Sequence, residues 1–597
     1  MTEQAIRDVW CAREASLQTE IQRQTSRYNL ISWLRLVVFL AGAVVVYLCW
    51  SVSTGWAIGL GAGVLVFFLY LIRYHAGISE ELNLMRRMAT ICQYEIRSLG
   101  GDRSGGVTGE GYGSSQHPYA ADLDLFGRGG MFELICRTAT SMGRDRLAQW
   151  LLQPLYTPAD IRGRQQAVMS LAALPDQGVT FQALGQAEDP GEQRLQELTG
   201  WGLPPIPRVE ILRVLSWVMP ALTLAASIAG FVGWISWLPG TLLLLFNLSL
   251  AAAYMSLTRQ VQARLDQLAP TVRRIQRLVV NITERDYPDL APRQRLDQAP
   301  RALEALSELG AAFDLRLNAV AVLLLNGLLL WDIRCLLRTA DWHQSWHPKL
   351  APWLDALADW DALLSLARYT ATHPAYVWPD VVSEGTLYEA ENLGHPLLRP
   401  AGRVDNPLHL PTPGSLYLIT GANMAGKSTY LRAVGVNLVL AMCGAPVCAS
   451  RMQFVPMPVF TCMRATDSLA DHASYFFAEL NRLRQLMDLL EQQQPVMVIL
   501  DEILRGTNSH DKQTGSMGLI RRLVRMGACG LAATHDLALG SLADELPGRV
   551  ILKRFEVDIQ GDELTFDYLL RDGLAQHLNA TYLMRRMGLL EEQAAEA

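Results

Sequence analysis

Residues 416–429 read Leu-Tyr-Leu-Ile-Thr-Gly-Ala-Asn-Met-Ala-Gly-Lys-Ser-Thr. The first five residues are mostly apolar, which is typical of a short buried strand. The next eight, Gly421 to Ser428, follow the pattern GxxxxGKS, and the stretch from Thr429 to Leu440 has helical character. A strand, a glycine-rich loop and a helix in this order form a phosphate-binding loop. The sequence therefore predicts a C-terminal α/β domain that binds a nucleotide.

The loop contains residue types that suit the phosphates of ATP. Its glycines let backbone N–H groups turn inward, and the N-terminus of the helix adds positive potential. Lys427 is expected to reach the β- and γ-phosphates, and the hydroxyl of Ser428 to ligate Mg²⁺. The residues expected around the nucleotide are Gly421, Ala422, Asn423, Met424, Ala425, Gly426, Lys427, Ser428 and Thr429.

Two further strands end in polar residues. The apolar run Val496–Leu500 is followed by Asp501 and Glu502. Asp501 suits the Mg²⁺ shell, and Glu502 suits a role in positioning and polarising the attacking water. The run 530–534 ends in His535, at the sheet edge where parallel sheets bind ligands. We expect ATP hydrolysis with Glu502, His535 and Lys427 as the catalytic residues, His535 sensing the γ-phosphate.

Two pairs of long apolar runs precede this domain. The first pair covers 31–50 and 56–72, and the second covers 211–232 and 238–257. Each run is long enough to cross about 30 Å of hydrocarbon, so each pair predicts a transmembrane helical hairpin. A third apolar stretch, Leu317–Trp331, contains two asparagines and is predicted to be a buried core helix.

The positive charges define a topology for these hairpins. Neither tight turn contains Arg or Lys. The positive-inside rule then places both termini in the cytoplasm of a multi-pass protein of the cell (inner) membrane. The arginines at the outer ends of the hairpins are Arg27, Arg35, Arg73, Arg208, Arg213, Arg259 and Arg264.

The expected fold class is an α plus α/β multidomain protein with transmembrane hairpins, an all-α core or lever domain and a C-terminal P-loop (ABC-like) ATPase domain. Gly100–Ser115 is glycine-rich and polar, so it is predicted to be a flexible linker. The predicted parts are a cytoplasmic N-terminal helix (1–30), hairpin 1 (31–74), a helix and glycine-rich linker (75–118), the first part of the helical core (119–208), hairpin 2 (209–258), the lever and second part of the core (259–385) and the ATPase domain (386–597).

Several of these segments resemble the MutS family of DNA mismatch-repair ATPases. The segment 420–432, Thr-Gly-Ala-Asn-Met-Ala-Gly-Lys-Ser-Thr-Tyr-Leu-Arg, resembles its Walker A motif. The segment 500–508, Leu-Asp-Glu-Ile-Leu-Arg-Gly-Thr-Asn, resembles its Walker B motif and the following loop. Upstream, 122–127 and 140–144 look like the start of the family's helical core, and 394–396 like the start of its ATPase domain.

The resemblance implies further roles. Residues 471–479 look like the family's signature segment, which implies a homodimer through the ATPase domains, with Ser474 reaching the partner's nucleotide in trans. Val404 is implied to pack on the adenine, and the last helices, 573–590, to close the dimer. The sequence departs from the family at Ala422 and Ala425, where a proline and a glycine are common. Both changes are small and should spare phosphate binding.

The function of the ATP cycle stays open at this stage. No mismatch-reading domain is visible, because residues 1–100 are taken up by the first hairpin. One hypothesis is a membrane-anchored MutS-like ATPase that clamps DNA at the membrane. The alternatives are a mechanical ATPase that acts on a membrane protein or on the lipid bilayer, and a scaffold that binds ATP without turnover. The net charge of −6 supplies no global attraction to DNA, so basic surface patches would have to supply it.

Overall fold

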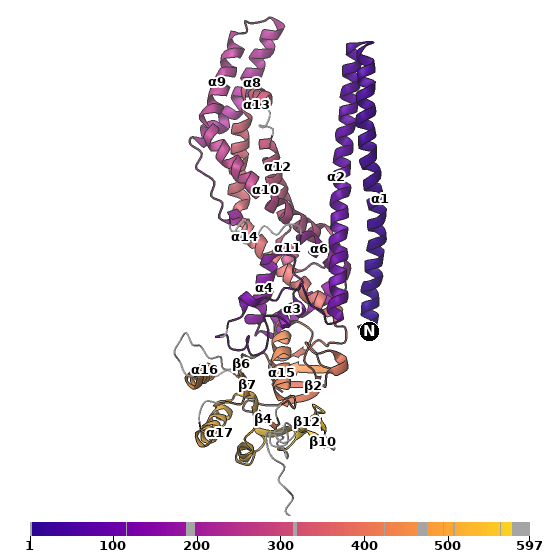
Figure 1. The fold of residues 1–597 in the computed structure, drawn as a ribbon. Helices are drawn as coiled ribbons and strands as arrows, with labels where there is room; N and C mark the ends of the chain where they lie inside the picture. Colours follow the sequence, from indigo (N-terminus) through magenta and orange to yellow (C-terminus); the bar gives the residue numbers. More distant parts are fainter. Residues whose placement is uncertain are drawn as a thin grey trace, which may run out of the picture.

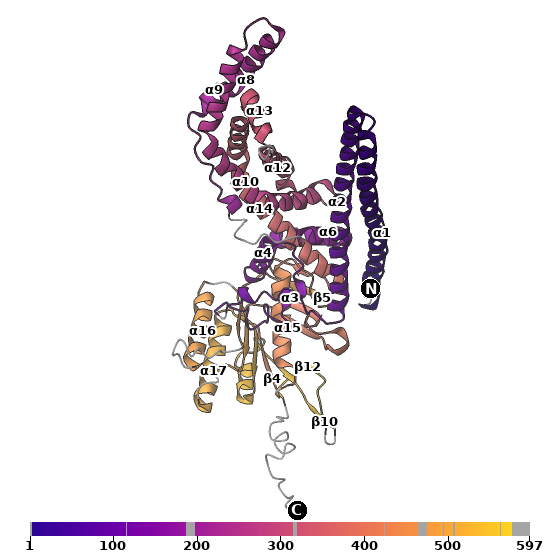
Figure 2. The same ribbon diagram turned by 45° about the horizontal axis from the view of Figure 1, so that its top comes forward.

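The computed structural model describes residues 3–114, 116–186, 197–314, 319–422, 424–463, 475–492, 495–504, 508–560 and 563–575. Helices dominate the chain as far as residue 372, and the first strand begins at Asp380. Figure 1 shows two helical arms that rise from a helical middle, with the α/β domain at the opposite end. Figure 2 shows the same separation of the two arms from another side.

The first arm is an antiparallel pair of long helices, α1 (Glu3–Trp50) and α2 (Thr54–Leu99), joined by a short turn. At 1.5 Å per residue each helix is about 70 Å long. The apolar halves lie next to the turn, where Gly42 packs so closely that a Cβ there would lie 2.4 Å from Val64. We call this hairpin the stalk.

Two domain boundaries predicted from the sequence, at residues 30 and 74, lie inside the helices of the stalk. Both helices continue through them without a break. The polar halves stay helical because they also pack on each other, and the Gln93 amide donates to Glu14 at 3.0 Å. At the base of the stalk Trp10 is buried together with Cys92 and Val179, so the stalk is fixed to α6 (Pro175–Gly185).

The second arm contains α8 (Val209–Val232) and α9 (Leu238–Ala253), and it bends by 58° into α10 (Met255–Glu284). Helices α1, α2 and α8 are long and apolar enough to cross a membrane, and the bent pair α9–α10 would add a fourth. Bulky apolar side chains on both arms are exposed, among them Trp33, Phe39, Trp217 and Phe231.

Helix α13 (Ala319–Leu329) lies against this second arm. The amide of Asn247 on α9 donates to Thr223 on α8 at 2.9 Å and to the carbonyl of Gly327 on α13 at 2.8 Å. The prediction that Leu317–Trp331 is a buried core helix holds only in part: within the described residues Asn326 and Leu330 are buried, whereas Leu323 and Leu324 are 58% and 56% exposed. The apolar composition of this stretch reflects its place beside α8 and α9.

The helical middle joins both arms to the α/β domain. Its longest helix, α14 (Trp331–Thr372), has 42 residues and runs from the second arm to the first strands. Trp360 and Tyr369 on α14 are almost completely buried in the main core. The other helices of the middle are α3 (Met131–Ile135), α4 (Ser141–Leu152), α5 (Pro158–Ala172), α11 (Ala291–Arg295) and α12 (Ala299–Asp314).

The glycine-rich segment that starts at Gly100 is ordered in its described residues and is not the predicted flexible linker. It contains a short 3₁₀ helix, Glu110–Tyr112, and its glycines allow close packing. A Cβ at Gly109, which has φ 67°, would lie 2.6 Å from the Phe132 ring. At Gly106 a Cβ would lie 2.5 Å from the hydroxyl of Tyr94. The glycines therefore serve tight contact with α2 and α3.

The α/β domain holds three sheets, the smallest of which is an antiparallel pair of β10 and β11. The six-stranded sheet has the order β12-β9-β4-β8-β7-β6, and all neighbours are parallel except β12 and β9. The four-stranded sheet has the order β1-β5-β2-β3. The strands are β1 (Asp380–Val381), β2 (Tyr388–Leu393), β3 (Asn406–Leu410), β4 (Leu416–Gly421), β5 (Arg451–Phe454), β6 (Val459–Cys462), β7 (Met497–Asp501), β8 (Cys529–Thr534), β9 (Val550–Phe555), β10 (Asp558–Gln560), β11 (Glu563–Thr565) and β12 (Leu570–Asp572). Its helices are α15 (Lys427–Met442), α16 (Tyr475–Leu490), α17 (Ser509–Arg525) and α18 (Leu542–Glu545).

Candidate functional site

The central strand β4 leads directly into the glycine-rich loop, and α15 begins at Lys427. Gly421 has φ 149°, and a Cβ there would lie 2.6 Å from the carbonyl oxygen of Phe555 on β9. Gly426 has φ 103°, a left-handed conformation that favours glycine. The loop thus wraps around the N-terminus of α15, and the backbone N–H groups there can bind an anion.

Lys427 lies inside this loop and is only 5% exposed. Its Nζ donates to the carbonyl oxygens of Gly421 at 2.6 Å and Ala422 at 2.8 Å. Burial lowers the pKa of Lys427 to about 8, while the carboxylates of Asp501 and Glu502 act in the opposite direction. The ammonium group is therefore positioned at the centre of the loop, with two acids nearby.

Ser428 and Asp501 come together across the loop. The Ser428 Oγ donates a 2.6 Å hydrogen bond to Oδ2 of Asp501, which ends the neighbouring buried strand β7. A hydroxyl and a carboxylate are hard oxygen ligands that suit Mg²⁺, which usually keeps several waters and takes few protein ligands. Within the described ranges no cluster of three or more His, Cys, Asp or Glu could hold a metal ion. The pair therefore fits Mg²⁺ shared with a phosphate better than a site built from protein ligands alone.

Glu502 and His535 form a second pair at the same sheet edge. Nε2 of His535 contacts Oε1 of Glu502, and Nδ1 of His535 lies 3.0 Å from the carbonyl oxygen of Gly421. Glu502 has φ 49°, a strained conformation for a non-glycine residue, and its N–H donates to Ala533 on β8 at 3.0 Å. In this backbone conformation the Glu502 carboxylate contacts His535, which in turn lies beside Gly421 of the loop.

These residues surround a cavity of about 620 Å³. Its lining includes the apolar side chains of Leu393, Leu398 and Val404, which suit a nucleotide base. Lys427 and Asp501 also line it. The cavity thus offers both apolar and charged side chains, as a nucleotide requires. Of the residues predicted from the sequence, it is lined by Val404, Ala422, Met424, Gly426, Lys427, Ser428, Thr429, Asp501 and Glu502.

Sequence reasoning missed several residues that line this cavity, among them Leu393, Phe555 and Tyr568. Tyr568 lines the cavity from the segment before β12, and a Cβ at Gly426 would lie 3.1 Å from its ring. Asn406 holds that segment, because its amide donates to the carbonyl of Tyr568 and its oxygen accepts from the N–H of Leu570. The sequence contains no motif around Tyr568, so only the pairing of β12 with β9 shows its proximity to the loop.

Three predicted features lie outside the described residues. Asn423 of the loop and Ser474 of the signature segment are among them. So are residues 576–590 of the predicted C-terminal helices, while Gly573 directly follows strand β12. The described end of the signature segment is Glu479, whose Oε1 accepts from the N–H of Leu504 at 2.6 Å. Glu479 therefore links α16 to the loop that follows Glu502.

The helical middle is attached to the site through Asp122. The carboxylate of Asp122 is 2% exposed and accepts from Thr461 Oγ1 at 2.7 Å and from the N–H of Met463 at 3.1 Å. Arg482 on α16 lies 3.4 Å from the same oxygen. Arg432 on α15 donates to the Asp122 carbonyl at 3.0 Å. One residue of the middle therefore contacts both helices that adjoin the candidate site.

Comparisons with known proteins agree with this arrangement. Residues 417–591 match the family model of MutS domain V, and residues 119–195 match that of MutS domain III. The chain is 35% identical over 226 residues to the DNA mismatch repair protein MutS of Natronomonas pharaonis, which covers 37% of this chain and 26% of that protein. It is 33% identical over 225 residues to the MutS protein of Thermotoga petrophila, covering 37% of this chain and 28% of that protein. The match to the DNA mismatch repair protein msh3 of Aspergillus fumigatus is 32% over 234 residues, or 37% of this chain and 20% of that protein. The matched region thus spans well under a third of these relatives.

Proposed function

Because this chain belongs to the MutS family, we propose that it binds and hydrolyses ATP in the cavity beside the loop at 421–428. The observation that carries the proposal is the convergence of Lys427, the Ser428–Asp501 pair and the Glu502–His535 pair at one edge of a parallel sheet. Three separate strands, β4, β7 and β8, supply these groups. This placement matches the rule that ligands of open parallel sheets bind at the carboxyl ends of strands.

Each residue then has a defined task. Lys427 and the N-terminus of α15 neutralise the phosphate charge, since both present N–H donors to the loop interior. Glu502 accepts a hydrogen bond from the attacking water and orients it, while His535 holds the carboxylate and faces the loop. Mg²⁺ held by Ser428 and Asp501 would neutralise charge that develops on the phosphate oxygens.

Equilibrium nucleotide binding tests the first half of this proposal. A fluorescent ATP analogue should bind to the wild-type chain, and Lys427→Ala should lose that binding. The matched control is Lys512→Ala on α17, because Lys512 does not line the cavity. Equal binding by wild type and Lys427→Ala would sink the proposed site.

Membrane anchoring is the second part of the proposal. Its support is the length and apolar composition of α1, α2 and α8, together with the bent pair α9–α10 and the exposed bulky side chains on these arms. A soluble protein of this size rarely leaves such large apolar surfaces open. The arginine pattern places the nucleotide site in the cytoplasm and the turns of both hairpins on the outer side of the cell membrane.

Cysteine labelling in whole cells tests this topology. In a background with Cys11 and Cys49 replaced by serine, Ser51→Cys in the stalk turn should react with an impermeant maleimide added outside. Ser79→Cys in the polar half of α2 should react only after the cells are opened. The reverse pattern, or extraction of the chain from the membrane fraction by salt alone, contradicts the anchoring.

The ATP cycle would close and reopen a homodimer in which the two chains meet through their α/β domains. Support comes from the resemblance of residues 471–479 to the family's signature segment and from Glu479, which connects α16 to the loop after Glu502. ATP binding would close two chains around their nucleotides, and hydrolysis would reopen them. The variant Glu502→Gln with ATP should sediment as a dimer, whereas Ser474→Ala with ATP should remain monomeric at the same concentration.

The target of this motion is DNA at the membrane in our first hypothesis. Its support is the name shared by the relatives, DNA mismatch repair protein. The second hypothesis is a mechanical ATPase acting on a membrane protein or lipid, and the observation that favours it is the stalk, since residues 3–99 form two long helices. Turnover in lipid nanodiscs with homoduplex, mismatched and branched DNA separates the two. A stimulation that disappears at raised salt supports DNA as a ligand, and turnover indifferent to all three supports the second hypothesis.

A further inference from the structure

A second cavity, of about 140 Å³, lies where the base of the stalk meets the α/β domain. Its lining comes from four places: the ends of α1 and α2, the loop that starts at Gly101, the C-terminal end of α14, and the segment 396–400. None of the residues with a proposed catalytic role lines it. We call it the stalk cavity.

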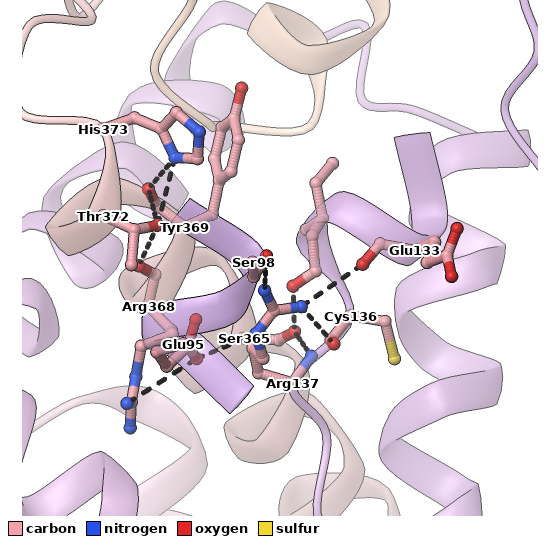
Figure 3. Close-up of polar contacts among 11 residues, drawn as sticks. Glu95, Ser98, Glu133, Cys136, Arg137, Ser365, Arg368, Tyr369, Thr372 and His373 are labelled. Carbon is pink, nitrogen blue, oxygen red and sulfur yellow. Dashed lines mark hydrogen bonds and ion pairs between the residues drawn. The ribbon is translucent and has the colours of Figure 1, made fainter. Parts of the chain in front are cut away.

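Positive charge exceeds negative charge in the stalk cavity. Arg103, Arg137 and Arg399 line it, and Glu95 is the one carboxylate in the lining. Glu95 is 1% exposed and is engaged already, because Arg137 Nε donates to its Oε1 at 2.8 Å. Figure 3 shows this pair together with Arg368, which approaches the same carboxylate at 3.8 Å.

One further carboxylate, Glu133, lies close to Arg103 and is the strongest counter-charge acting on it. Its Oε2 also accepts from the N–H of Gly129 at 2.7 Å. Burial lowers the pKa of His373 to about 4, so this residue is neutral at physiological pH and adds no charge of either sign. Glu95 and Glu133 together face Arg103, Arg137, Arg368 and Arg399, so positive charge remains in excess.

Arg103 and Arg399 both line the cavity, where Arg103 is half-buried and Arg399 is exposed. Arg103 Nε is buried, and no acceptor among the described residues lies within hydrogen-bonding distance of it. Burial also lowers the pKa of Arg103, which reflects the cost of holding this charge away from water. The guanidinium of Arg399 lies on the backbone of Gly101, where a Cβ would come within 1.9 Å of Nη2. The glycine at 101 thus lets this arginine reach the cavity.

From this geometry we propose that the stalk cavity binds a small organic anion, with its carboxylate or phosphate group on Arg103 and Arg399. An anion would give the Nε of Arg103 the acceptor it lacks, and charge-assisted hydrogen bonds of this kind are strong. The lining also includes the apolar side chains of Leu99, Leu134 and Leu397, which suit a short hydrocarbon portion of the ligand.

The stalk cavity and the candidate nucleotide site share a lining residue. Leu398 lines both cavities, so the segment around it forms the partition between them. The N–H of Leu397 donates to Nδ1 of His395, which lines the nucleotide cavity on the other side. An anion in the stalk cavity should therefore change the affinity of the chain for ATP. This second effect rests on the proposed function, whereas anion binding itself does not.

Thermal melting of the full chain in nanodiscs tests the proposal, with inorganic phosphate and benzoate as separate probes. The background is Lys427→Ala, which removes phosphate binding by the loop at 421–428. Saturating anion should raise the melting temperature by on the order of 1–3 °C. Arg103→Gln should abolish this rise, because it removes the guanidinium that would hold the anion. Arg128→Gln, an exposed arginine on the nearby loop, is the matched control and should keep the rise.

Three outcomes are decisive. A rise with phosphate alone assigns a phosphate ligand, and a rise with benzoate alone assigns a carboxylate. No rise with either probe, or an equal rise in Arg103→Gln, overturns the proposal. If Arg103→Gln fails to fold, Ala375→Trp at the exposed rim of the cavity serves instead and should also block the rise. If the wild-type chain binds the anion but does not hydrolyse ATP, the proposal for the stalk cavity stands and the proposed ATPase activity is wrong.

Discussion

Ser428 Oγ donates a 2.6 Å hydrogen bond to Oδ2 of Asp501, which lies 73 residues later in the chain. The bond joins the first turn of α15 to the end of β7, so the two oxygens expected to bind Mg²⁺ are already adjacent. Asp501 is itself buried at the end of a strand whose five residues are all buried. The proposed Mg²⁺ site therefore lies at the sheet edge, where the hydroxyl and the carboxylate are within hydrogen-bonding distance of each other.

Removing either oxygen should separate nucleotide binding from metal use. Ser428→Ala and Asp501→Asn should each raise the Mg²⁺ concentration needed for half-maximal turnover by about 10–100-fold. Binding of ATP without Mg²⁺ should stay close to wild type, because Lys427 and the loop backbone remain. An unchanged Mg²⁺ requirement in both variants would contradict the assigned roles.

His535 should matter for turnover and not for binding. His535→Ala removes the ring that contacts Glu502 and the Gly421 carbonyl, so the water-orienting carboxylate loses its support. We expect turnover to fall by about 10²-fold with little change in ATP affinity. His510→Ala is the matched control, because that histidine on α17 has an 88% exposed side chain. A parallel loss of affinity would assign His535 to nucleotide binding instead.

Asp122 and Asp124 form a matched pair for testing how the helical middle holds the α/β domain. Asp122→Asn weakens a buried carboxylate that accepts from Thr461 and Met463, so it should destabilise the chain by about 1–3 kcal/mol. Asp124 is more exposed and lies 3.5 Å from Arg432, so Asp124→Asn should cost about 0–1 kcal/mol. Asparagine also tolerates the φ of 49° at this position. Urea denaturation gives both values, and equal costs would contradict this assignment.

Asp361 should give the chain a distinct pH dependence of stability. Burial raises the pKa of Asp361 from its ordinary 3.8 to about 6, although the N–H groups of Ala139 and Thr140 donate to it. Between pH 4 and 6 the folded chain therefore keeps a proton that the unfolded chain has released. This contribution is full below pH 4 and is lost as the pH rises through about 6, by about 3 kcal/mol in total.

Asp361→Asn should remove this slope. The difference in unfolding free energy between wild type and variant should change by about 3 kcal/mol between pH 4 and 7 and stay constant above pH 7. A pH-independent difference in unfolding free energy reflects the loss of the Asp361 carboxylate as a hydrogen-bond acceptor and does not affect the test. A difference that is flat across this range would show that Asp361 does not titrate there.

Local patterns predicted the candidate site well, because a GxxxxGKS loop and strand-ending acids are contiguous in sequence. The order strand, loop and helix at 416–442 is confirmed by β4 and α15. Asp361 and Tyr568 could not be found in this way, since their roles depend on contacts between distant segments. Gly143 illustrates the point: a Cβ there would lie 2.2 Å from Asp361 Oδ2, a constraint that its own neighbours do not reveal.

The extents of the helices were harder to predict than their existence. The turns of both hairpins were predicted correctly, because apolar runs and uncharged turns mark them. The polar halves of α1 and α2 were also predicted to be helical, but the sequence did not reveal that they pack on each other within the stalk. The glycine-rich segment after Gly100 has the composition of a linker, yet its glycines serve close packing against Tyr94 and Phe132.

ATP turnover by the full chain in lipid nanodiscs, compared with turnover by Glu502→Gln, is the most direct test of hydrolysis at this site. We expect Mg²⁺-dependent phosphate release by wild type and a fall of about 10²–10⁴-fold in Glu502→Gln, which should still bind ATP. Turnover that is equal in the two proteins would contradict the claim that Glu502 orients the attacking water. Absence of turnover in the wild type under every condition would show a scaffold that binds ATP without hydrolysing it.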